Sequence, residues 1–565
     1  MKFSKKLLSC LLGASMLSGA VFADDFGFDD GGSGFGDSGD FSESSSSSSA
    51  LSVNGEAVME GRLYVDKRDS DGDRLKFADF PTDVFPMLRL GIDYTGAYTD
   101  FSAKIKLNKY SLGNYKQDIL EEFTARVYVN SNLQLEAGKM KVVWGKGDKL
   151  HVLDNFNAND YTDYIIPDYI DRRIAEPMFR AVISTESGFK LEGIYTPTMT
   201  PDRLATSGTW QPLATKTLSA AVTQAAATQL ATLNATQAAT AVAMANAAAA
   251  AQTAVAAAQA AGAAAQANPT PENQAAYNAA VAQANQAAQT AQAYATAYGT
   301  AFASYMNYQT AALSLMSDST SIYPDTFSFK YGQAGLRTTF TLGPIDLGAS
   351  YYYGHYKQPT ANLSVLADAS NIDNIKKNLL HFDRVQIFGL ETAFILWRFN
   401  TRAEFAYNLT EDTAGDDPWV KNNSLAWVGG FDIDLPIHNV NLNVQEQGSY
   451  ILKNDKIDSG DGLSAAFKKA GLKDCEYDAK GRYTNNKLVV ALTDSWDHEK
   501  TKIDIKGIWG IERSDVIVMP KLSRNIFDGF DLSVSGLFIW CKDENSEFNG
   551  WEHNSFVTLG AKYQF

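Results

Sequence analysis

The chain has 565 residues, a formal net charge of −16 and a mean hydropathy of −0.22. This negative charge argues against a nucleic acid as partner, because a phosphate backbone attracts basic proteins. The mean hydropathy is too polar for a bundle of membrane-spanning helices, and beyond the N-terminus we expect no stretch of roughly 20 strongly apolar residues.

The N-terminal segment predicts export from the cytoplasm. A basic start precedes an apolar run that ends at Phe22 and is followed by Ala23. This arrangement is typical of a secretory signal peptide, here residues 1–23. Too few apolar residues precede Cys10 for that cysteine to mark a lipoprotein cleavage site. Residues 24–50 are rich in Gly, Ser and Asp, and we expect them to form a flexible acidic leader.

From Leu51 onward the chain contains short stretches in which apolar and polar residues alternate. Successive side chains of a strand point to opposite faces, so alternation predicts strands with one apolar face and one polar face. The clearest examples are Phe101–Leu107, Phe123–Val129, Ile345–Tyr351, Val440–Val444 and Leu532–Phe538. In a secreted chain, many such stretches predict an all-β fold, a single antiparallel transmembrane β-barrel; a soluble sandwich is the alternative.

The predicted connections alternate between tight turns and long segments. The tight turns lie at Thr99-Asp100, Asn130–Asn132, Glu186–Gly188, Gly343-Pro344, Phe399-Asn400, Pro436–His438 and Asp528-Gly529. The long segments lie near residues 66–83, 110–118, 145–176, 197–325, 356–382, 409–421, 452–484 and 541–552. We count about 18 strands, with about 16 as the alternative, divided between residues 51–215 and 319–565. In such barrels the tight turns and both termini are periplasmic, so we expect the long segments to face outward.

One long connection contains an Ala-rich insertion, residues 216–318. Between Lys216 and Asp318 the only charged residue is Glu272, and Ala, Gln, Thr and Asn make up most of the remainder. Ala favours helix, and the prolines beside Glu272 interrupt the run near its middle, which predicts an antiparallel helical hairpin. Each arm would extend on the order of 70 Å. A mobile low-complexity linker is the alternative.

The polar faces of the predicted strands line the lumen, and strands two to seven carry many basic residues there. This predicted basic wall consists of Arg89, Lys104, Lys106, Arg126, Lys139, Lys141, Arg180 and Lys190. Positive charge beside low-dielectric walls attracts anions or orients zwitterions. Carboxylates such as Glu122 and Glu136 lie on the same strands. A self-neutralising lining without selectivity is therefore the alternative.

The third long connection begins with Trp144-Gly-Lys-Gly-Asp148 and continues through Leu153-Asp-Asn-Phe-Asn-Ala-Asn-Asp160. These motifs resemble a family of porin-like bacterial outer-membrane β-barrels of unassigned substrate, which carries a Trp-Gly-x-x-Asp turn followed by a Leu-Asp-x-x-Asn-x-x-Asp segment. The resemblance implies a loop folded toward the pore. Its charged residues would form a constriction, and they are Asp148, Asp154, Asp160, Asp168, Arg172 and Arg173. A surface loop capped by its own turns is the alternative.

The chain ends in an alternating strand. Its apolar positions are Val557, Leu559, Ala561, Tyr563 and Phe565. An aromatic residue at the end of such a strand resembles the C-terminal assembly signal of outer-membrane barrels. The resemblance implies recognition by the barrel assembly machinery, with the five side chains facing lipid.

The residue patterns predict no metal site, no cofactor and no enzymatic activity. Asp69–Asp73 begins like a calcium loop, but Phe80 occupies the position of the last ligand. The six histidines have no zinc-ligand spacing, and nucleophile-elbow, phosphate-loop and dinucleotide motifs do not occur. Cys475 and Cys541 remain after signal cleavage, and sequence spacing does not decide whether they form a disulfide.

Two functions fit these patterns. The first is an outer-membrane channel that passes small hydrophilic solutes, with a preference for anionic or zwitterionic ones. The second is a surface-exposed adhesin or interaction protein, in which the barrel anchors a projecting helical hairpin that binds a surface ligand. In both, outer-membrane lipid surrounds the barrel; a homotrimer is an open alternative to a monomer.

Overall fold

The computed structural model describes residues 50–148, 150–417, 419–454, 483–542 and 546–565. The predicted signal peptide, the leader up to residue 49 and Cys475 lie outside this part of the chain, so the structure does not test them. The described residues divide into two compact units. Leu218–Pro324 and Asn362–Leu380 form a helical unit, and the other described residues form a barrel unit.

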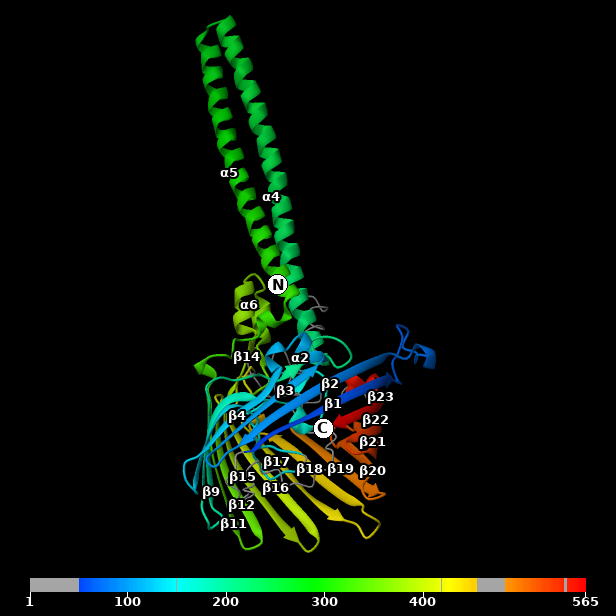
Figure 1. Cartoon of the computed structure of the whole chain (residues 1–565). Coiled ribbons are helices and arrows are strands. Elements are labelled where there is room, and N and C mark those ends of the chain that lie inside the picture. Colours follow the sequence, from blue (N-terminus) through cyan, green and yellow to red (C-terminus); the bar gives the residue numbers. More distant parts are fainter. Residues whose placement is uncertain (1–49, 149, 418, 455–482, 543–545) are drawn as a thin grey trace. The chain divides into compact units, whose positions relative to one another are not determined.

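The barrel unit contains one 18-stranded antiparallel sheet that closes on itself (Figure 1). Its strands are β1 (Ala50–Tyr64), β2 (Thr82–Thr95), β3 (Thr99–Asn108), β4 (Leu120–Tyr128), β5 (Leu133–Met140), β8 (Glu176–Ser184), β9 (Lys190–Thr196), β11 (Gln333–Leu342), β12 (Ile345–His355), β15 (Arg384–Leu396), β16 (Phe399–Thr410), β17 (Ser424–Asp434), β18 (Asn441–Ile451), β19 (Thr484–Trp496), β20 (Thr501–Gly510), β21 (Val516–Phe527), β22 (Phe530–Trp540) and β23 (Phe556–Gln564). Each strand pairs with the next in this series, and β23 pairs with β1. The expected strand count is confirmed.

Shorter elements lie in the connections of this sheet. The short strands are β6 (Ala158–Tyr161), β7 (Arg173–Ile174), β10 (Arg203–Leu204), β13 (Thr360–Ala361) and β14 (Leu380–His381). The short α-helices are α2 (Lys109–Gly113) and α3 (Tyr169–Arg172). The 3-10 helices are Phe77–Asp79, Lys116–Asp118, Ser319–Ile322, Phe329–Tyr331, Leu363–Ala367 and Asn549–Asn554. Of these, β6 pairs with both β7 and β10.

Tight turns and long connections lie at opposite ends of the barrel, as predicted. The tight turns are residues 96–98, 129–132, 185–189, 343–344, 397–398, 435–440, 497–500 and 528–529. The connections at the other end are residues 65–81, 109–119, 141–175, 197–332, 356–383, 411–423, 452–483, 511–515 and 541–555. The first residue of β1 and the last residue of β23 lie at the tight-turn end.

The sequence analysis missed the turn between β19 and β20, because no Gly or Pro marks it. Asp497, His498 and Glu499 all have positive φ, which residues with a Cβ rarely adopt. The next connection, residues 511–515, was missed for a different reason. It is far shorter than the others at its end of the barrel and so gives no long polar signal.

The sheet closes where the C-terminal residue meets β1. The backbone N–H of Gly55 donates to the carbonyl oxygen of Phe565 at 2.9 Å, and the N–H of Phe565 donates back at 3.0 Å. A Cβ on Gly55 would lie 2.5 Å from the Phe565 ring, so the glycine leaves room for the terminal aromatic side chain. The Tyr563 ring stacks beside it, with the two ring centroids 6.0 Å apart.

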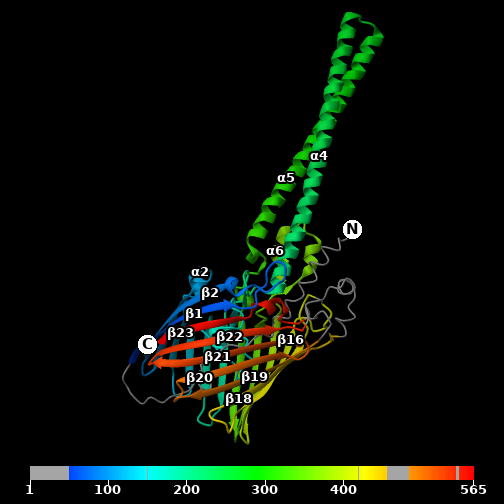
Figure 2. The ribbon, with the colours of Figure 1, turned by 90° about the vertical axis from the view of Figure 1, so that its right-hand side faces the viewer.

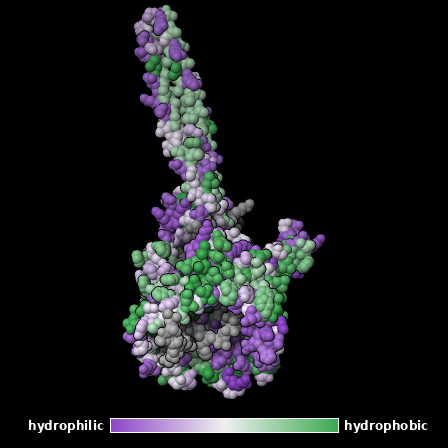
Figure 3. Space-filling model, viewed as in Figure 1, coloured by the Kyte–Doolittle hydropathy of each residue, from purple (hydrophilic) through white to green (hydrophobic). Residues whose placement is uncertain are grey.

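The outward faces of the strands are apolar. Leu336, Leu390 and Leu559 are 56%, 60% and 66% exposed, respectively. Figure 3 shows hydrophobic residues gathered over β2 and β3, where Ile92 and Phe101 are exposed. Such a surface is unfavourable in water and is suited to hydrocarbon.

The helical unit contains the predicted hairpin. Its long helices are α4 (Leu213–Ala267) and α5 (Pro271–Ser317), which lie side by side in Figures 1 and 2. The side chain of Thr270 caps α5 by accepting from the N–H of Asn273, and Pro271 occupies the first turn. Helices of 55 and 47 residues span on the order of 80 and 70 Å. Helix α6 (Ile372–Asn378) belongs to the same unit.

Contacts between the two arms show their antiparallel pairing. Gln237 donates to the hydroxyl of Tyr298 at 3.4 Å, and Gly262 faces the ring of Tyr277. Near the base of α5, Tyr308 is buried and donates to the carbonyl oxygen of Ala369 at 2.7 Å. The aromatic residues of α5 therefore contribute partly to packing, while others, such as Phe302, stay 44% exposed.

The expectation that no long apolar stretch follows the N-terminus is wrong for helix α4. By length and composition alone, Thr215–Ala267 is apolar enough to cross a membrane, with a mean hydropathy of 1.3 over an 18-residue window. The reason is its alanine content, since alanine counts as apolar although it buries little surface. Composition of this kind in a single helix is weak evidence for a membrane span.

Deletion of Phe565 should impair assembly of the barrel. The two lost backbone hydrogen bonds contribute about 1–3 kcal/mol in total, and the aromatic ring over Gly55 is lost with them. We expect less folded protein in the outer membrane, measured as the fast-migrating band of unheated samples in electrophoresis. Gly61→Ala is the control, because a Cβ there meets no atom within 4 Å. Unchanged barrel levels after the deletion would contradict this expectation.

Candidate functional site

The connection between β5 and β8, residues 141–175, lies inside the barrel, and we call it the inner loop. Its residues Trp144, Leu150 and Phe156 are at most 1% exposed. They belong to two buried clusters that also contain residues of other connections and inward-facing residues of strands around the ring. The strand residues include Met178 of β8, Ile194 of β9, Tyr352 of β12, Ile387 of β15, Val428 of β17, Val489 of β19, Ile508 of β20 and Ile539 of β22.

Two glycines in the barrel wall leave room for the apolar side chains of the inner loop. A Cβ on Gly335 would lie 2.8 Å from the Trp144 ring and 2.9 Å from the Phe156 ring. A Cβ on Gly389 would lie 2.5 Å from Leu153. Larger residues at these wall positions would force the loop away from the wall.

The carboxylate of Glu404 anchors the start of the inner loop to β16. It accepts hydrogen bonds from the backbone N–H groups of Gly147 at 2.6 Å and Val152 at 2.8 Å, and its Oε1 lies 2.9 Å from Nδ1 of His151. Glu404 is 2% exposed. Buried carboxylates are stable only when their lone pairs are satisfied, and these contacts satisfy both oxygens.

The contacts with Glu404 explain why the Trp144–Asp148 motif contains two glycines. A Cβ on Gly145 would overlap the Glu404 carboxylate, and its φ of +112° already disfavours other residues. A Cβ on Gly147 would overlap the carbonyl oxygen of Leu150. The motif is thus a tight turn shaped around a carboxylate of the opposite wall.

Three ion pairs, two of them buried, hold the remainder of the inner loop. Asp163 pairs with Arg62 of β1 at 2.6 Å, and Asp171 pairs with Arg89 of β2 at 2.5 Å. Within the loop, the side chains of Asp154 and Arg173 are each 2% exposed and lie 2.5 Å apart. Burial raises the pKa of Asp154, and the guanidinium of Arg173 opposes that rise.

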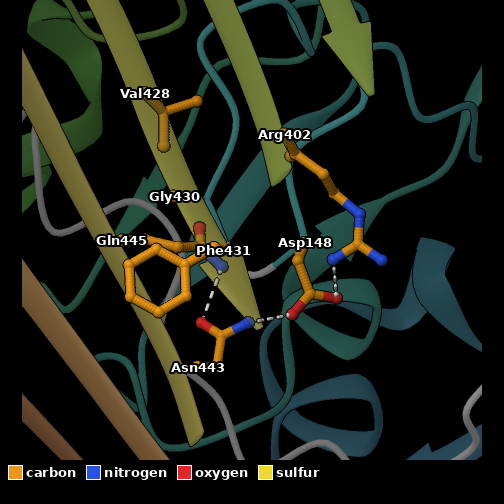
Figure 4. A pocket seen from close by; sticks show the side chains of 8 residues that line it. Asp148, Arg402, Val428, Gly430, Phe431, Asn443 and Gln445 are labelled. Carbon is orange, nitrogen blue, oxygen red and sulfur yellow. Dashed lines mark hydrogen bonds and ion pairs between the residues drawn. The ribbon is translucent and has the colours of Figure 1, made fainter. Parts of the chain in front are cut away.

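The structure distributes the six predicted constriction residues over several places. Asp148 faces β16 and β18, where it accepts from Asn443 at 2.7 Å and lies 3.7 Å from Arg402 (Figure 4). Gln445 donates to Asn443 at 3.0 Å in the same group. The space among these side chains is about 10 Å³, which is room for one water.

The other predicted loop residues lie elsewhere. Asp154 and Arg173 form the buried pair described above. Asp160 accepts from the backbone and hydroxyl of Thr162, and the carbonyl oxygen of Asp168 accepts from the N–H of Arg172. Arg172 is fully buried, with its guanidinium 5.8 Å from the centre of the Tyr161 ring. The six residues therefore do not converge on one ring.

The predicted basic wall is largely an array of ion pairs. At least seven of its eight cations have a carboxylate within 4.0 Å among the described residues. These pairs are Arg89–Glu121 at 2.7 Å, Lys104–Glu122 at 3.4 Å, Lys106–Glu121 at 3.6 Å, Arg126–Glu136 at 2.7 Å, Lys139–Asp118 at 3.7 Å, Lys141–Glu121 at 3.1 Å and Arg180–Glu192 at 2.7 Å. Lys190 lies at the start of β9, opposite Ser184 and Thr339. The geometry resembles the self-neutralising alternative more closely than an uncompensated positive wall.

A cavity of about 180 Å³ lies between the inner loop and the wall, and we call it the wall cavity. The inner loop contributes residues between His151 and Arg173, and β16 to β19 contribute inward-facing residues. Its other walls come from Asp202, Tyr356–Gln358, Lys421-Asn422, Tyr483 and Arg513. Most of the side chains that line it are amides, hydroxyls or charged groups, as expected for a site that contacts a hydrophilic molecule.

The sequence analysis missed Arg62, Asp163, Glu404 and Lys421. A signal existed for Glu404, because alternation along Phe399–Thr410 places it on the lumen face. Its partner Gly147 lies 257 positions away, however, and no spacing rule links the two. Strands two to seven, which carry the predicted basic wall, contain none of these four residues.

In the residues that the structure describes, no group of three or more His, Cys, Asp or Glu side chains has the geometry of a metal site. Cys541 is a free thiol and half-buried, and burial raises its pKa to about 12. Cys475 lies outside the described residues, so the structure does not test whether it forms a disulfide with Cys541.

Comparisons with known proteins give structural similarity only. No protein-family model matches the chain, and no curated protein matches it. Among solved structures, the chain is similar to OccAB4 of Acinetobacter baumannii, with 9% identity, 91% of this chain and 97% of that chain covered, and a TM-score of 0.39. It is also similar to a BenF-like porin from Pseudomonas fluorescens Pf-5, with 7% identity, 92% and 98% covered, and a TM-score of 0.40.

A third similar structure is Salmonella typhi OmpF in complex with daunomycin, with 8% identity, 91% and 97% covered, and a TM-score of 0.35. TM-scores and identities this low carry no argument about solute or mechanism. The barrel itself is established by its own strand pairing. The family suggested by the inner-loop motifs stays a prediction.

Glu404→Gln should loosen the inner loop. The neutral amide keeps one acceptor oxygen and turns its NH₂ toward backbone donors, so at least one buried donor loses its partner. We expect the free energy of unfolding to fall by about 3 kcal/mol, measured by urea titration of tryptophan fluorescence in detergent. Glu411→Gln, at an exposed position next to β16, is the control. Equal stability of the two variants would show that Glu404 does not anchor the loop.

Proposed function

We propose that the protein is a channel across a bacterial outer membrane for small hydrophilic solutes. The observation that carries the proposal is the division of the closed sheet into an apolar outer face and a charged inner face. Outward side chains such as Leu390 are exposed, whereas inward ones such as Arg337 and Glu391 are buried and paired at 2.7 Å. In hydrocarbon only helices and closed barrels satisfy every backbone polar group.

We propose a preference for anionic or zwitterionic solutes. The lumen wall alternates cations and carboxylates, an arrangement that suits molecules carrying both charges. Lys104 supports the anionic side of the preference, because its side chain is 43% exposed despite its contact with Glu122. Narrowing of the lumen by the inner loop would bring passing solutes within reach of these charges.

The orientation proposed from the barrel places its tight-turn end, with both chain termini, in the periplasm. The long connections and the insertion between β9 and β11 then face the exterior. The final strand, with Phe565 bonded to Gly55, supports its proposed role as the segment that the barrel assembly machinery recognises. Trimerisation is proposed only by analogy with other barrels of this class and rests on no observed interface.

Purified, folded protein should conduct ions in planar lipid bilayers. We expect discrete conductance steps whose reversal potential in a salt gradient indicates the preferred ion. The control is the same preparation after heat unfolding, which should give no steps. Absence of steps from folded protein would refute the channel.

Lys104→Glu should shift ion preference toward cations. The substitution replaces a partly exposed positive charge by a negative one next to Glu122, and an exposed lumen charge acts directly on passing ions. The measurement is the reversal potential in a salt gradient, and the expected shift is several-fold in the permeability ratio. Lys76→Glu, an exposed lysine of the β1–β2 connection, controls for net charge. A channel that conducts but shows no shift would remove the proposed role of the wall.

A surface interaction role for the helical unit is the second candidate. Helix α5 carries exposed large apolar residues, namely Tyr294, Phe302, Met306 and Leu313, each at least 41% exposed. Such residues on an otherwise polar helix are typical of a surface that binds a protein or matrix ligand.

Protease treatment of intact cells should cleave the insertion if it faces the exterior. The loop between α4 and α5, around Pro269, is the expected site because its backbone is outside regular structure. Mass spectrometry of the released fragments measures the cleavage, with an established surface protein as the positive control. An intact insertion beside a cleaved control would contradict the proposed orientation.

A further inference from the structure

The wall cavity has the size of one small organic molecule. Its volume is about 180 Å³. A water needs roughly 10–15 Å³ of such space, so the cavity would hold on the order of a dozen water-sized atoms. A monosaccharide acid has a similar number of heavy atoms.

Lys421 gives the wall cavity a positive charge without a compensating carboxylate. The residue is 8% exposed, and its ammonium lies 4.7 Å from the centre of the Tyr356 ring. In the described part of the chain, no carboxylate lies within 4.0 Å of that ammonium. The carboxylate of Asp383 accepts from the backbone N–H of Lys421 instead, at 3.0 Å. A cation–π contact offsets only part of the cost of burying an ammonium.

Other cations of the wall cavity differ from Lys421. Arg173 pairs with Asp154, and Lys357 lies 3.1 Å from the carboxylate of Glu176. Arg513 also lines the cavity and has an interaction partner of its own. Asp202 also faces the cavity, where its carboxylate accepts from the backbone N–H of Asn159 at 2.8 Å. The ammonium of Lys421 is therefore the natural place for an anionic group of a ligand.

The wall cavity also presents hydrogen-bond acceptors that need donors. Oε1 of Gln447 and Oδ1 of Asn159 are buried and have no hydrogen-bond partner among the described residues. Leaving such an atom unsatisfied costs free energy, because the atom has lost its hydrogen bonds to water. Both atoms would accept hydrogen bonds from hydroxyl groups of a ligand, whereas an apolar acid would leave them without donors.

We propose that the wall cavity binds a monosaccharide-sized, hydroxylated anion. The acid group contacts the ammonium of Lys421, and ligand hydroxyls donate to Gln447 and Asn159. This inference rests on the proposed channel, since it names the class of solute that the channel would hold on its way across the membrane. The acid group is a carboxylate or a phosphate, which share the recognition chemistry.

Isothermal titration of the full-length, folded protein in detergent tests the proposal. The probes are glucuronate for the carboxylate, glucose 6-phosphate for the phosphate, glucose as the neutral analogue and acetate as the anion without hydroxyls. We expect saturable binding of at least one hydroxylated anion, at least about tenfold tighter than glucose or acetate, the effect of one charge-assisted hydrogen bond. Equal affinities for the four probes, or binding of none, would overturn the proposal.

Substitutions locate the site. Lys421→Gln should weaken binding of the hydroxylated anion by about tenfold, and Lys421→Arg, which keeps the charge, should retain most of it. Gln447→Leu should weaken the hydroxylated anion and leave acetate unchanged. Lys76→Gln, exposed and outside the wall cavity, is the control. Fast migration in unheated electrophoresis shows whether each variant is folded.

Conductance separates the failure of this inference from the failure of the channel. Wild-type protein that conducts but binds no probe would refute the hydroxylated-anion site and leave the channel intact. Protein that binds a probe through Lys421 but does not conduct would refute the channel and leave the binding site. Unchanged binding in folded Lys421→Gln would place the anion elsewhere and refute the site as proposed.

Discussion

Closure of the sheet between β1 and β23 is the constraint on which the rest of the structure depends. In hydrocarbon an open edge would leave a row of unpaired N–H and C=O groups, each costing several kcal/mol. The backbone bonds between Gly55 and Phe565 complete the last pairing at the chain terminus. A closed ring also encloses a lumen. The inward-facing side chains of every strand then form a wall against which the connections can pack.

The inner loop packs against that wall. Its apolar side chains fill space left by small wall residues such as Gly335, and its backbone donors meet the carboxylate of Glu404. Arg62 and Asp163 add a buried ion pair between β1 and the loop. Removing one partner of such a pair leaves an uncompensated buried charge, which is why these anchors act as a set. The loop consequently divides the lumen, and the wall cavity is one of the spaces that remain.

Most charged side chains in the lumen form pairs of opposite sign, and they do not gather into a region of one sign. Most cations of strands two to seven have carboxylate neighbours, as Arg126 has in Glu136, so the wall they form is nearly neutral locally. Lys421 differs because it lies in a connection, where the neighbouring carboxylate of Asp383 bonds to its backbone. A nearly neutral wall beside the buried ammonium of Lys421, which has no carboxylate of the described residues within 4.0 Å, favours binding of an anion at one place over attraction along the whole pore.

The sequence by itself determined the strand pattern, the separation of tight and long connections and the helical hairpin. These features follow from local rules, namely period-two alternation, turn residues and the helix preference of alanine interrupted by Pro269 and Pro271. Only the tertiary structure decided which charges meet. Glu404 and Gly147 are 257 positions apart, and the isolation of Lys421 depends on which segments line one cavity. Contacts across a lumen join distant segments, and no local period encodes them.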